Sequence, residues 1–235
     1  MTQEHNKERR FWEMRNKVYS IFLENFIPYN DLLEIIVQEL NPAPNLYILD
    51  AGCGPGILEK MITRKKIPDM KVEALDISRK IIDVAKKTNN YSKNVVFKIA
   101  NLNNKLEYND CSFDAIVCIN VLYLIQRPTD ILSEFYRILR NGGKLIISTP
   151  KYNFSYISLL LNHFSKGDTI RKIKSLIFLP LIFFFEFVIT KHEREGKYHQ
   201  LNQNDTIKLF QGTNFRDLKI SSCYADQNFL VIAKK

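Results

Sequence analysis

The sequence predicts an α/β fold built on a mostly parallel sheet, and three observations support this prediction. Apolar strand-like runs alternate with helical runs between residues 46 and 150, and strands separated by helices at this spacing pair in parallel through right-handed crossovers. The strand-like runs are almost continuously apolar, as expected when helices cover both faces of a sheet. The last two runs are joined by only four residues, Tyr224 to Gln227. This link is too short for a parallel crossover, so the final pair is antiparallel.

The expected elements follow in order. Residues 11–40 place apolar side chains at helical spacing, with a break near Pro28 and an end at the proline-containing stretch 41–45. Pro128 near the start and Gly142 after the end mark another helix. The predicted strands cover residues 46–51, 71–76, 95–100, 113–120, 143–150, 218–223 and 229–234, and the later helices cover residues 57–66, 79–90, 128–141 and 204–215. Residues 151–200 fit no strand–helix unit.

The composition is that of an ordinary globular chain. Hydrophobic residues make up 46% of the 235 residues and charged residues 25%, which excludes a disordered protein. The formal net charge of +9 can favour anionic lipid, nucleic acid or an acidic substrate. The basic residues are scattered rather than massed in one run, so a solvated lysine-rich surface is the favoured interpretation and nucleic acid is not the expected partner.

The cysteines and the N-terminal residues indicate the compartment. The four cysteines form no C-x-x-C pair and have no histidine at metal-ligand spacing, so we expect no metal site. Free thiols suit a reducing cytoplasm, and Cys118, within an apolar run, is expected to be a small buried hydrophobe. The first residues contain no apolar h-region, so we predict no signal peptide and a cytoplasmic location.

The stretch LDAGCGPG follows the first predicted strand and precedes a helix. Gly52 and Gly54 let the backbone approach a ligand, and Gly56 permits tight packing where the helix begins. The dinucleotide fingerprint G-x-G-x-x-G would need a third glycine at position 57, where Ile57 stands. Asp50, just before the first glycine, would repel a pyrophosphate but suits an ammonium group. The turn therefore predicts a ligand with an amino-acid end and no phosphate.

Polar residues follow the next strands at the same edge of the predicted sheet, where parallel sheets bind ligands. Asp76 ends the second strand, and a carboxylate there can accept both hydroxyls of a ribose. Asn101 and Leu102 follow the third strand, where a side chain and a backbone N–H can reach an adenine edge. A turn-forming role for Asn101 remains equally open. Asn120 ends the fourth strand and faces the same cleft.

These motifs resemble the class I S-adenosylmethionine-dependent methyltransferases, above all the small-molecule branch. LDAGCGPG, LDIS, IANLN, FDAIVCINVLYLI and LRNGGKLIISTP occur in that family's order and spacing. The resemblance implies a Rossmann-like seven-stranded sheet of order 3-2-1-4-5-7-6 with strand 7 antiparallel. It also implies a helical cap over residues 1–44, a cofactor-binding core over 45–150 and 201–235, and an apolar helical insertion over 151–200.

The resemblance assigns roles around S-adenosylmethionine. The residues implied to bind the cofactor are Asp50, Gly52 and Gly54 at its methionine end, Asp76 at the ribose, Ile77 on the adenine face, Asn101 and Leu102 at the adenine edge, Asn120 near the methionine carboxylate, and Tyr19 closing over it. Many relatives carry His or Glu just after the fourth strand, where this chain has Tyr123 and Leu124. Tyr123 and His199 are the candidates for catalytic contacts, with cleft-wall packing and a surface position as the respective alternatives.

The expected reaction is in-line displacement of the methyl group onto a small, hydrophobic acceptor such as a quinone, lipid, isoprenoid or polyketide-type metabolite. Two alternatives stay open. One is an RNA or protein methyltransferase, which the +9 charge favours, although INVL stands where amino-group methylating relatives carry Asn/Asp-Pro-Pro-Tyr. The other is a protein that binds S-adenosylmethionine without transferring its methyl group.

The insertion contains a long apolar run, residues 175–190, interrupted by Pro180 and Glu186. Its apolar part would span about 21 Å as a helix, short of the roughly 30 Å hydrocarbon core of a bilayer. Three interpretations stand for residues 154–190: a lid over an apolar acceptor, an interfacial membrane anchor, and a homodimer surface or plain core. The anchor would use a basic patch on lipid headgroups, formed by Lys166, Arg171, Lys172 and Lys174.

Overall fold

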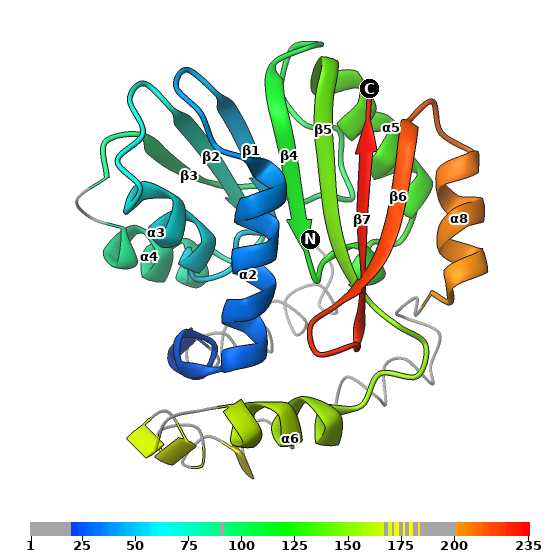
Figure 1. Ribbon diagram of the computed structural model, residues 1–235. Helices are drawn as coiled ribbons and strands as arrows, with labels where there is room; N and C mark the ends of the chain where they lie inside the picture. Colours follow the sequence, from blue (N-terminus) through cyan, green and yellow to red (C-terminus); the bar gives the residue numbers. More distant parts are fainter. Residues whose placement is uncertain are drawn as a thin grey trace, which may run out of the picture.

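A computed structural model describes residues 20–89, 92–166 and 201–235, with isolated positions at 169, 170, 172, 173, 176, 179, 180 and 183. Its seven strands form one sheet of order β3-β2-β1-β4-β5-β7-β6 (Figure 1). The first five strands run parallel to one another, and β7 runs antiparallel to its neighbours β5 and β6. This topology confirms the predicted fold class, including the final hairpin.

The strands and helices lie close to their predicted bounds. The strands are β1 (Tyr47–Ala51), β2 (Lys71–Asp76), β3 (Val95–Ile99), β4 (Phe113–Ile119), β5 (Leu139–Pro150), β6 (Arg216–Cys223) and β7 (Asn228–Lys234). The helices are α2 (Ile27–Leu40), α3 (Ile57–Thr63), α4 (Arg79–Thr88), α5 (Pro128–Ile138), α6 (Tyr156–Lys166) and α8 (Gln203–Gln211), with a 3-10 turn η1 (Leu122–Leu124). The break before α2 falls at Phe26, and Pro28 occupies its first turn.

The helices predicted over 57–66 and 204–215 end earlier, at Thr63 and Gln211, and one further boundary is wrong because a strand replaces the end of a predicted helix. The helix expected over residues 128–141 ends at Ile138, and the following residues already belong to β5. Leu139 pairs with Phe113, and a shift in register separates this pair from Ala115 with Lys144. Gly142 has a φ of 76°, which a helix cannot accommodate. Tertiary pairing with β4 therefore overrides the helical spacing of this segment.

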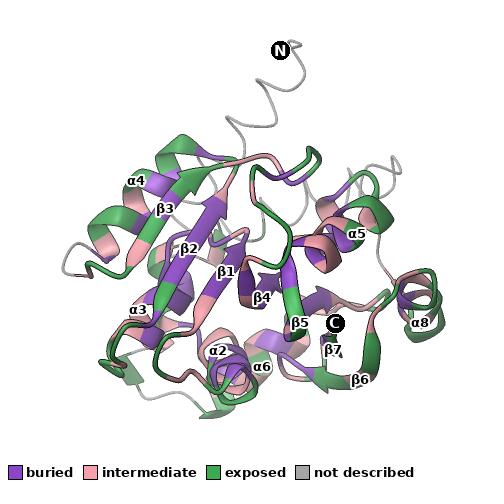
Figure 2. Ribbon diagram, turned by 90° about the horizontal axis from the view of Figure 1, so that it is seen from above, coloured by how far each residue is buried: buried purple, intermediate pink, exposed green. Residues whose placement is uncertain are grey.

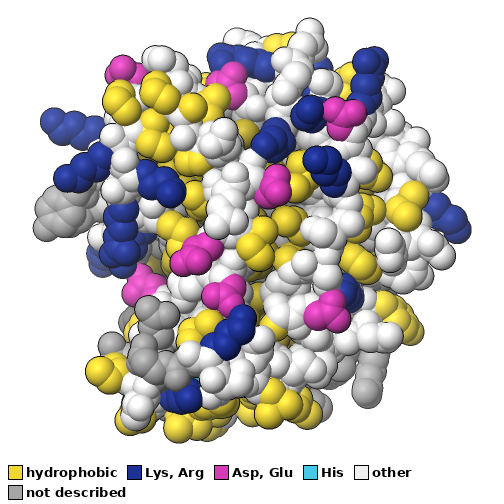
Figure 3. Space-filling model, in the orientation of Figure 1, with side chains coloured by type: hydrophobic (Ala, Val, Ile, Leu, Met, Phe, Trp, Pro, Cys, Tyr) yellow, Lys and Arg dark blue, Asp and Glu magenta, His cyan; other side chains and the backbone are white. Residues whose placement is uncertain are grey.

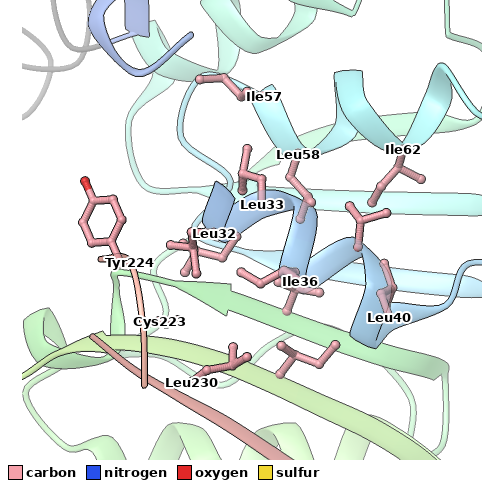
Figure 4. Close-up of a cluster of buried hydrophobic side chains, with 14 of the residues drawn as sticks. Leu32, Leu33, Ile36, Leu40, Ile57, Leu58, Ile62, Cys223, Tyr224 and Leu230 are labelled. Carbon is pink, nitrogen blue, oxygen red and sulfur yellow. The ribbon is translucent and has the colours of Figure 1, made fainter. Parts of the chain in front are cut away.

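The core lies on both faces of the sheet. One buried cluster joins α2 and α3 to the sheet; its residues include Leu32, Leu33, Ile36, Leu58 and Leu230 (Figure 4). A second cluster joins α5, α8 and η1 to the opposite face, with Phe113, Leu132 and Phe135 fully buried. Figure 2 shows the central strands β1, β2 and β4 buried between these helical layers. Because side chains on a strand alternate between faces, both clusters draw on the same strands.

Helix α6 crosses the edge of the sheet at which the parallel strands end (Figure 1). The fully buried His163 accepts the N–H of Ile27 at its Nδ1, 3.2 Å away, so this ring fixes α6 to the start of α2. Lys166 at the end of α6 pairs with Asp31 of α2 at 3.1 Å. Within the described residues, no helix is long and apolar enough to cross a bilayer.

Candidate functional site

The turn between β1 and α3 is held against the end of β2. The N–H groups of Gly52 and Cys53 both donate to the carbonyl oxygen of Leu75 at 2.8 Å. A Cβ added at Gly52 would lie 2.3 Å from Val121, so packing beyond β4 requires this glycine. A Cβ at Gly54 would meet nothing within 4 Å. Gly54 is therefore the position in this turn beside which space is open to a ligand.

The Asp76 carboxylate lies against the same turn. Its Oδ2 accepts the N–H of Gly54 at 3.1 Å, and its Oδ1 accepts the N–H of Ser78 at 2.8 Å. Burial raises the pKa of Asp76 to about 6, although these backbone hydrogen bonds act to lower it. The backbone N–H of Ile77 acts in the same direction, and a carboxylate offers about four acceptor sites. Asp76 is thus fixed in position and keeps capacity to accept a further hydroxyl donor.

Two further carboxyl groups are buried beside the turn. Asp50 is 2% exposed and Glu59, in the first turn of α3, is fully buried. Asp50 Oδ1 and both Glu59 oxygens have no hydrogen-bond donor in the described part of the chain. Burial raises the pKa of Asp50 to about 7, and the charge of Asp76 adds to the effect. Burial and the neighbouring Asp50 also raise the pKa of Glu59 far above its ordinary range. The pair therefore holds a proton near neutral pH.

A polar group joins the ends of β4 and β5 to the start of β7. Asn120 has a left-handed φ of 55°, and its N–H donates to the Ser148 carbonyl at 2.8 Å. The fully buried Asn228 donates from Nδ2 to Asn120 Oδ1 at 2.6 Å and to Ser148 Oγ at 2.7 Å. Asn228 Oδ1 and Thr149 Oγ1 have no partner among the described residues. The group therefore fixes Asn120 and keeps unused hydrogen-bonding capacity.

The predicted adenine contacts lie after β2 and β3. Ile77 follows Asp76 directly and is 45% exposed, which leaves an apolar face available. Leu102 is buried in the second core cluster. Asn101 Oδ1 accepts the backbone N–H of Asn103 at 3.0 Å and its side-chain amide at 3.3 Å. Both lone pairs of that oxygen are used in forming the turn, so an adenine contact by this side chain would come from its Nδ2 amide group.

The structure describes one of the two catalytic candidates, Tyr123, and not the other, His199. Tyr123 lies on η1, just beyond Asn120, and is buried. His199 and Tyr19 lie outside the described residues, as do Arg171 and Lys174 of the predicted basic patch. Cys118 is buried on β4, as predicted.

Two residues of this site were not predicted. Glu59 stands in the helical run ILEKMITRKK, where a charged side chain is usually interpreted as a solvent-facing residue. Asn228 begins the last strand, and its contact with Asn120 depends on the antiparallel pairing of β7 with β5. The sequence offered one signal for Glu59. It stands three residues after Gly56, at the start of the helix that follows the strand ending near Asp50.

The residues fit S-adenosylmethionine at this edge of the sheet. Gly54 leaves open space, Asp76 keeps acceptor capacity beyond its backbone hydrogen bonds, and Asp50 Oδ1 is a buried oxygen without a donor among the described residues. These features suit, in turn, close approach of the ligand, a ribose, and an ammonium group.

Comparison with known proteins gives relatives of the same kind. A family model described as a methyltransferase domain matches residues 42–205. Probable polyketide synthase 42 of Dictyostelium discoideum is 28% identical over 221 residues, which cover 81% of this chain and 8% of that protein. The mitochondrial ubiquinone biosynthesis O-methyltransferase of Schizosaccharomyces pombe is 33% identical over 128 residues, which cover 51% of this chain and 43% of that protein. The matched regions thus span less than half the length of both curated relatives.

A solved structure with the same fold comes from Aquifex aeolicus. This S-adenosylmethionine-dependent methyltransferase superposes with a TM-score of 0.63 at 17% identity, over 93% of this chain and 97% of that one. The sheet order, the glycine turn and a family model that matches more than half of the chain agree. The chain therefore belongs to the class I S-adenosylmethionine-dependent methyltransferases.

Proposed function

We propose that this chain transfers a methyl group from S-adenosylmethionine to a small, apolar acceptor of the quinone, lipid, isoprenoid or polyketide type. The observation that carries the proposal is the partly paired Asp76 carboxylate beside the open Gly54. The names of the two relatives, a polyketide synthase and a ubiquinone biosynthesis O-methyltransferase, support an acceptor of this class.

The residues of the turn hold the cofactor. In this proposal Asp76 accepts the ribose hydroxyls, Asp50 attracts the ammonium group, and Asn120, fixed by Asn228, lies near the methionine carboxylate. Tyr19 is proposed to close over the bound cofactor. When bound, S-adenosylmethionine supplies a methyl group on a sulfonium, which is already an activated electrophile. The main task of the chain is therefore to align donor and acceptor, and alignment can supply roughly 7–11 kcal/mol of the barrier.

The acceptor side is proposed to be formed by α6. This helix crosses the carboxyl edge of the sheet, and its Leu159 packs in the core while Ile157 and Leu161 are about two-thirds exposed, at 66% and 67%. Further exposed apolar side chains continue beyond it, at Ile170, Ile173, Leu176 and Phe183. Figure 3 shows apolar side chains gathered along this lower edge of the molecule. An apolar acceptor would gain burial against such a surface.

A hydroxyl acceptor would also need a base. Proton transfer by a positioned side chain contributes about 10²–10⁴-fold. Tyr123 is close in sequence to Asn120, and we propose it, together with His199, as the contacts to the acceptor atom.

Methyl transfer from labelled S-adenosylmethionine tests the proposal. The full chain is incubated with a panel of quinols, phenols and polyketide-type acceptors. RNA and a peptide library are tested in parallel as acceptors of the two alternative classes. We expect transfer to an apolar small molecule. Transfer only to RNA or peptide, or cofactor binding without any transfer, would overturn the proposed acceptor class or the activity.

A matched pair of variants tests the role of α6. Ile157→Ser removes an exposed apolar side chain from α6, and Val96→Ser removes one from β3, where Val96 is 49% exposed. We expect Ile157→Ser to raise the KM for the apolar acceptor several-fold and Val96→Ser to leave it unchanged. Equal KM values would contradict the role of α6. Binding of the wild type, lost in Ile157→Ser, to phospholipid vesicles would assign this face to a membrane surface instead.

A further inference from the structure

Two buried carboxyl groups, Asp50 and Glu59, lie beside the glycine turn in addition to Asp76. Binding of the ribose by Asp76 does not account for them. Both carboxyl groups come from adjacent elements, β1 and α3, and flank the glycine turn. Asp50 is 2% exposed and Glu59 fully buried. Three of their oxygens, Asp50 Oδ1 and both of Glu59, have no donor in the described chain. Leaving such groups without partners is costly in a folded protein, so the site is built to receive either protons or a cation.

The groups around the pair add to its negative potential. The charge of Asp76 on β2 raises the pKa of Asp50. The charges of both carboxyl groups of the pair raise the pKa of Cys53 in the turn, and the charge of Asp50 raises the pKa of Cys118 on β4. Burial and these charges raise the pKa of both thiols, so the thiols are neutral at pH 7. Each of these surrounding titratable groups is an acid, and none of them supplies a positive charge to the pair.

We propose that Asp50 and Glu59 share one proton in the cofactor-free protein and release it to solvent when the ammonium group of the cofactor binds. Glu59 is then a positioning residue that makes the site selective for a cationic amino-acid end. This inference rests on the proposed function, since it takes the ligand to be S-adenosylmethionine or its product. The ammonium replaces the proton as the positive charge between the two carboxyls.

The sign of the pH dependence follows from linkage. A proton lost on binding makes binding tighter as the pH rises, by up to about tenfold per pH unit while the free pair is protonated and the occupied pair is not. Asp76 contributes in the same direction, because ribose hydroxyls also favour its ionised form. The test must therefore separate the pair from Asp76.

The experiment is calorimetric titration of the full chain with S-adenosylhomocysteine in buffers of different ionisation enthalpy, between pH 6 and 8. The dependence of the measured enthalpy on the buffer gives the number of protons released. The matched probe is 5′-methylthioadenosine, which has the same ribose and adenine but no ammonium group. We expect S-adenosylhomocysteine to release a larger part of one proton than 5′-methylthioadenosine does, and Glu59→Gln to abolish that difference.

Each outcome decides the proposal. Equal proton release by the two ligands on the wild type would overturn it without any variant, so a Glu59→Gln protein that fails to fold does not block the test. The same excess release from a folded Glu59→Gln would also overturn it. Absence of binding by S-adenosylhomocysteine at every pH would instead overturn the proposed function, and this inference with it.

Discussion

Carboxyl groups at the two edges of the sheet differ in the donors they receive. Toward the amino-terminal edge of the parallel strands, Glu73 accepts the hydroxyls of Tyr47 and Tyr108 and pairs with Lys98. Burial alone would raise the pKa of Glu73, but these partners lower it below its ordinary value. At the carboxyl edge, Asp50 instead has an oxygen that receives no donor from the described residues, and burial raises its pKa to about 7.

The same contrast extends along the two edges. Glu134 binds Arg137 and the N–H of Leu106, and its pKa is lowered, chiefly by Arg137. Asp114 receives Arg140 through two contacts, at 2.7 and 2.8 Å. These carboxylates are paired with basic side chains, whereas Asp50 Oδ1 and both Glu59 oxygens beside the glycine turn have no donor among the described residues. Unpaired buried charge costs stability and is kept where a ligand supplies the partner.

The largest effect is expected for Asp76→Ala. The variant removes the proposed acceptor of the ribose hydroxyls, and each hydrogen bond to a charged group is worth about 1.5–3 kcal/mol. The Kd for S-adenosylhomocysteine should therefore rise by about 100-fold or more, as measured by calorimetric titration.

A control for this prediction comes from the other edge. Asp114→Asn removes a carboxylate that is paired with Arg140 away from the turn, so it should leave the Kd within about twofold, since an exposed ion pair contributes little. A Kd for Asp76→Ala that matches the wild type would contradict the assignment of the ribose site.

A smaller effect, on stability instead of binding, is expected for Glu73→Gln. The substitution leaves Lys98 and the two tyrosine hydroxyls with a weaker acceptor, at a cost of about 1–3 kcal/mol in the free energy of unfolding. Because the pKa of Glu73 is lowered in the folded state, this stability is present above the unfolded pKa of about 4.3 and is lost as the pH falls through the folded value. Urea unfolding at pH 7 and pH 3 should show a larger deficit at pH 7 than at pH 3. A deficit of equal size at both pH values would contradict this ionic origin.

The sequence predicted the sheet because its signals are local. Strand periodicity, the glycine turn and the four-residue link at Tyr224–Gln227 each lie within a short window, and together they define the topology. The helix predicted to reach residue 141 was wrong because pairing of Leu139 with Phe113 is decided by residues distant in sequence.

Site residues were predictable to the extent that they lie at strand ends. Asp50 and Asp76 lie in the last residues of their strands and Asn120 directly follows its strand, and a parallel sheet brings such ends to one edge. Glu59 was missed because its burial depends on how α3 packs against β1. The Asn101 turn was left open because the sequence does not show whether Asn103 donates to its side chain.

The smallest effect, and the one that separates the two edges most directly, is a gain in stability from Asp50→Asn. The folded pKa of Asp50 is raised from 3.8 to about 7, so the folded protein binds more protons than the unfolded chain between these values. Stability of the cofactor-free wild type should therefore fall as the pH rises through this window and stay low above it. Asparagine cannot ionise, so the variant should not show this loss and should be more stable by about 1–2 kcal/mol at pH 8, with no advantage at pH 4. Thermal unfolding across this range measures the difference, at about 2–4 °C per kcal/mol for a chain of this size. Saturating S-adenosylhomocysteine should reverse the order at pH 8, because the ligand stabilises only the protein that binds it well. Parallel pH profiles for wild type and variant would show that the Asp50 charge is already compensated within the protein, as it is at Glu73.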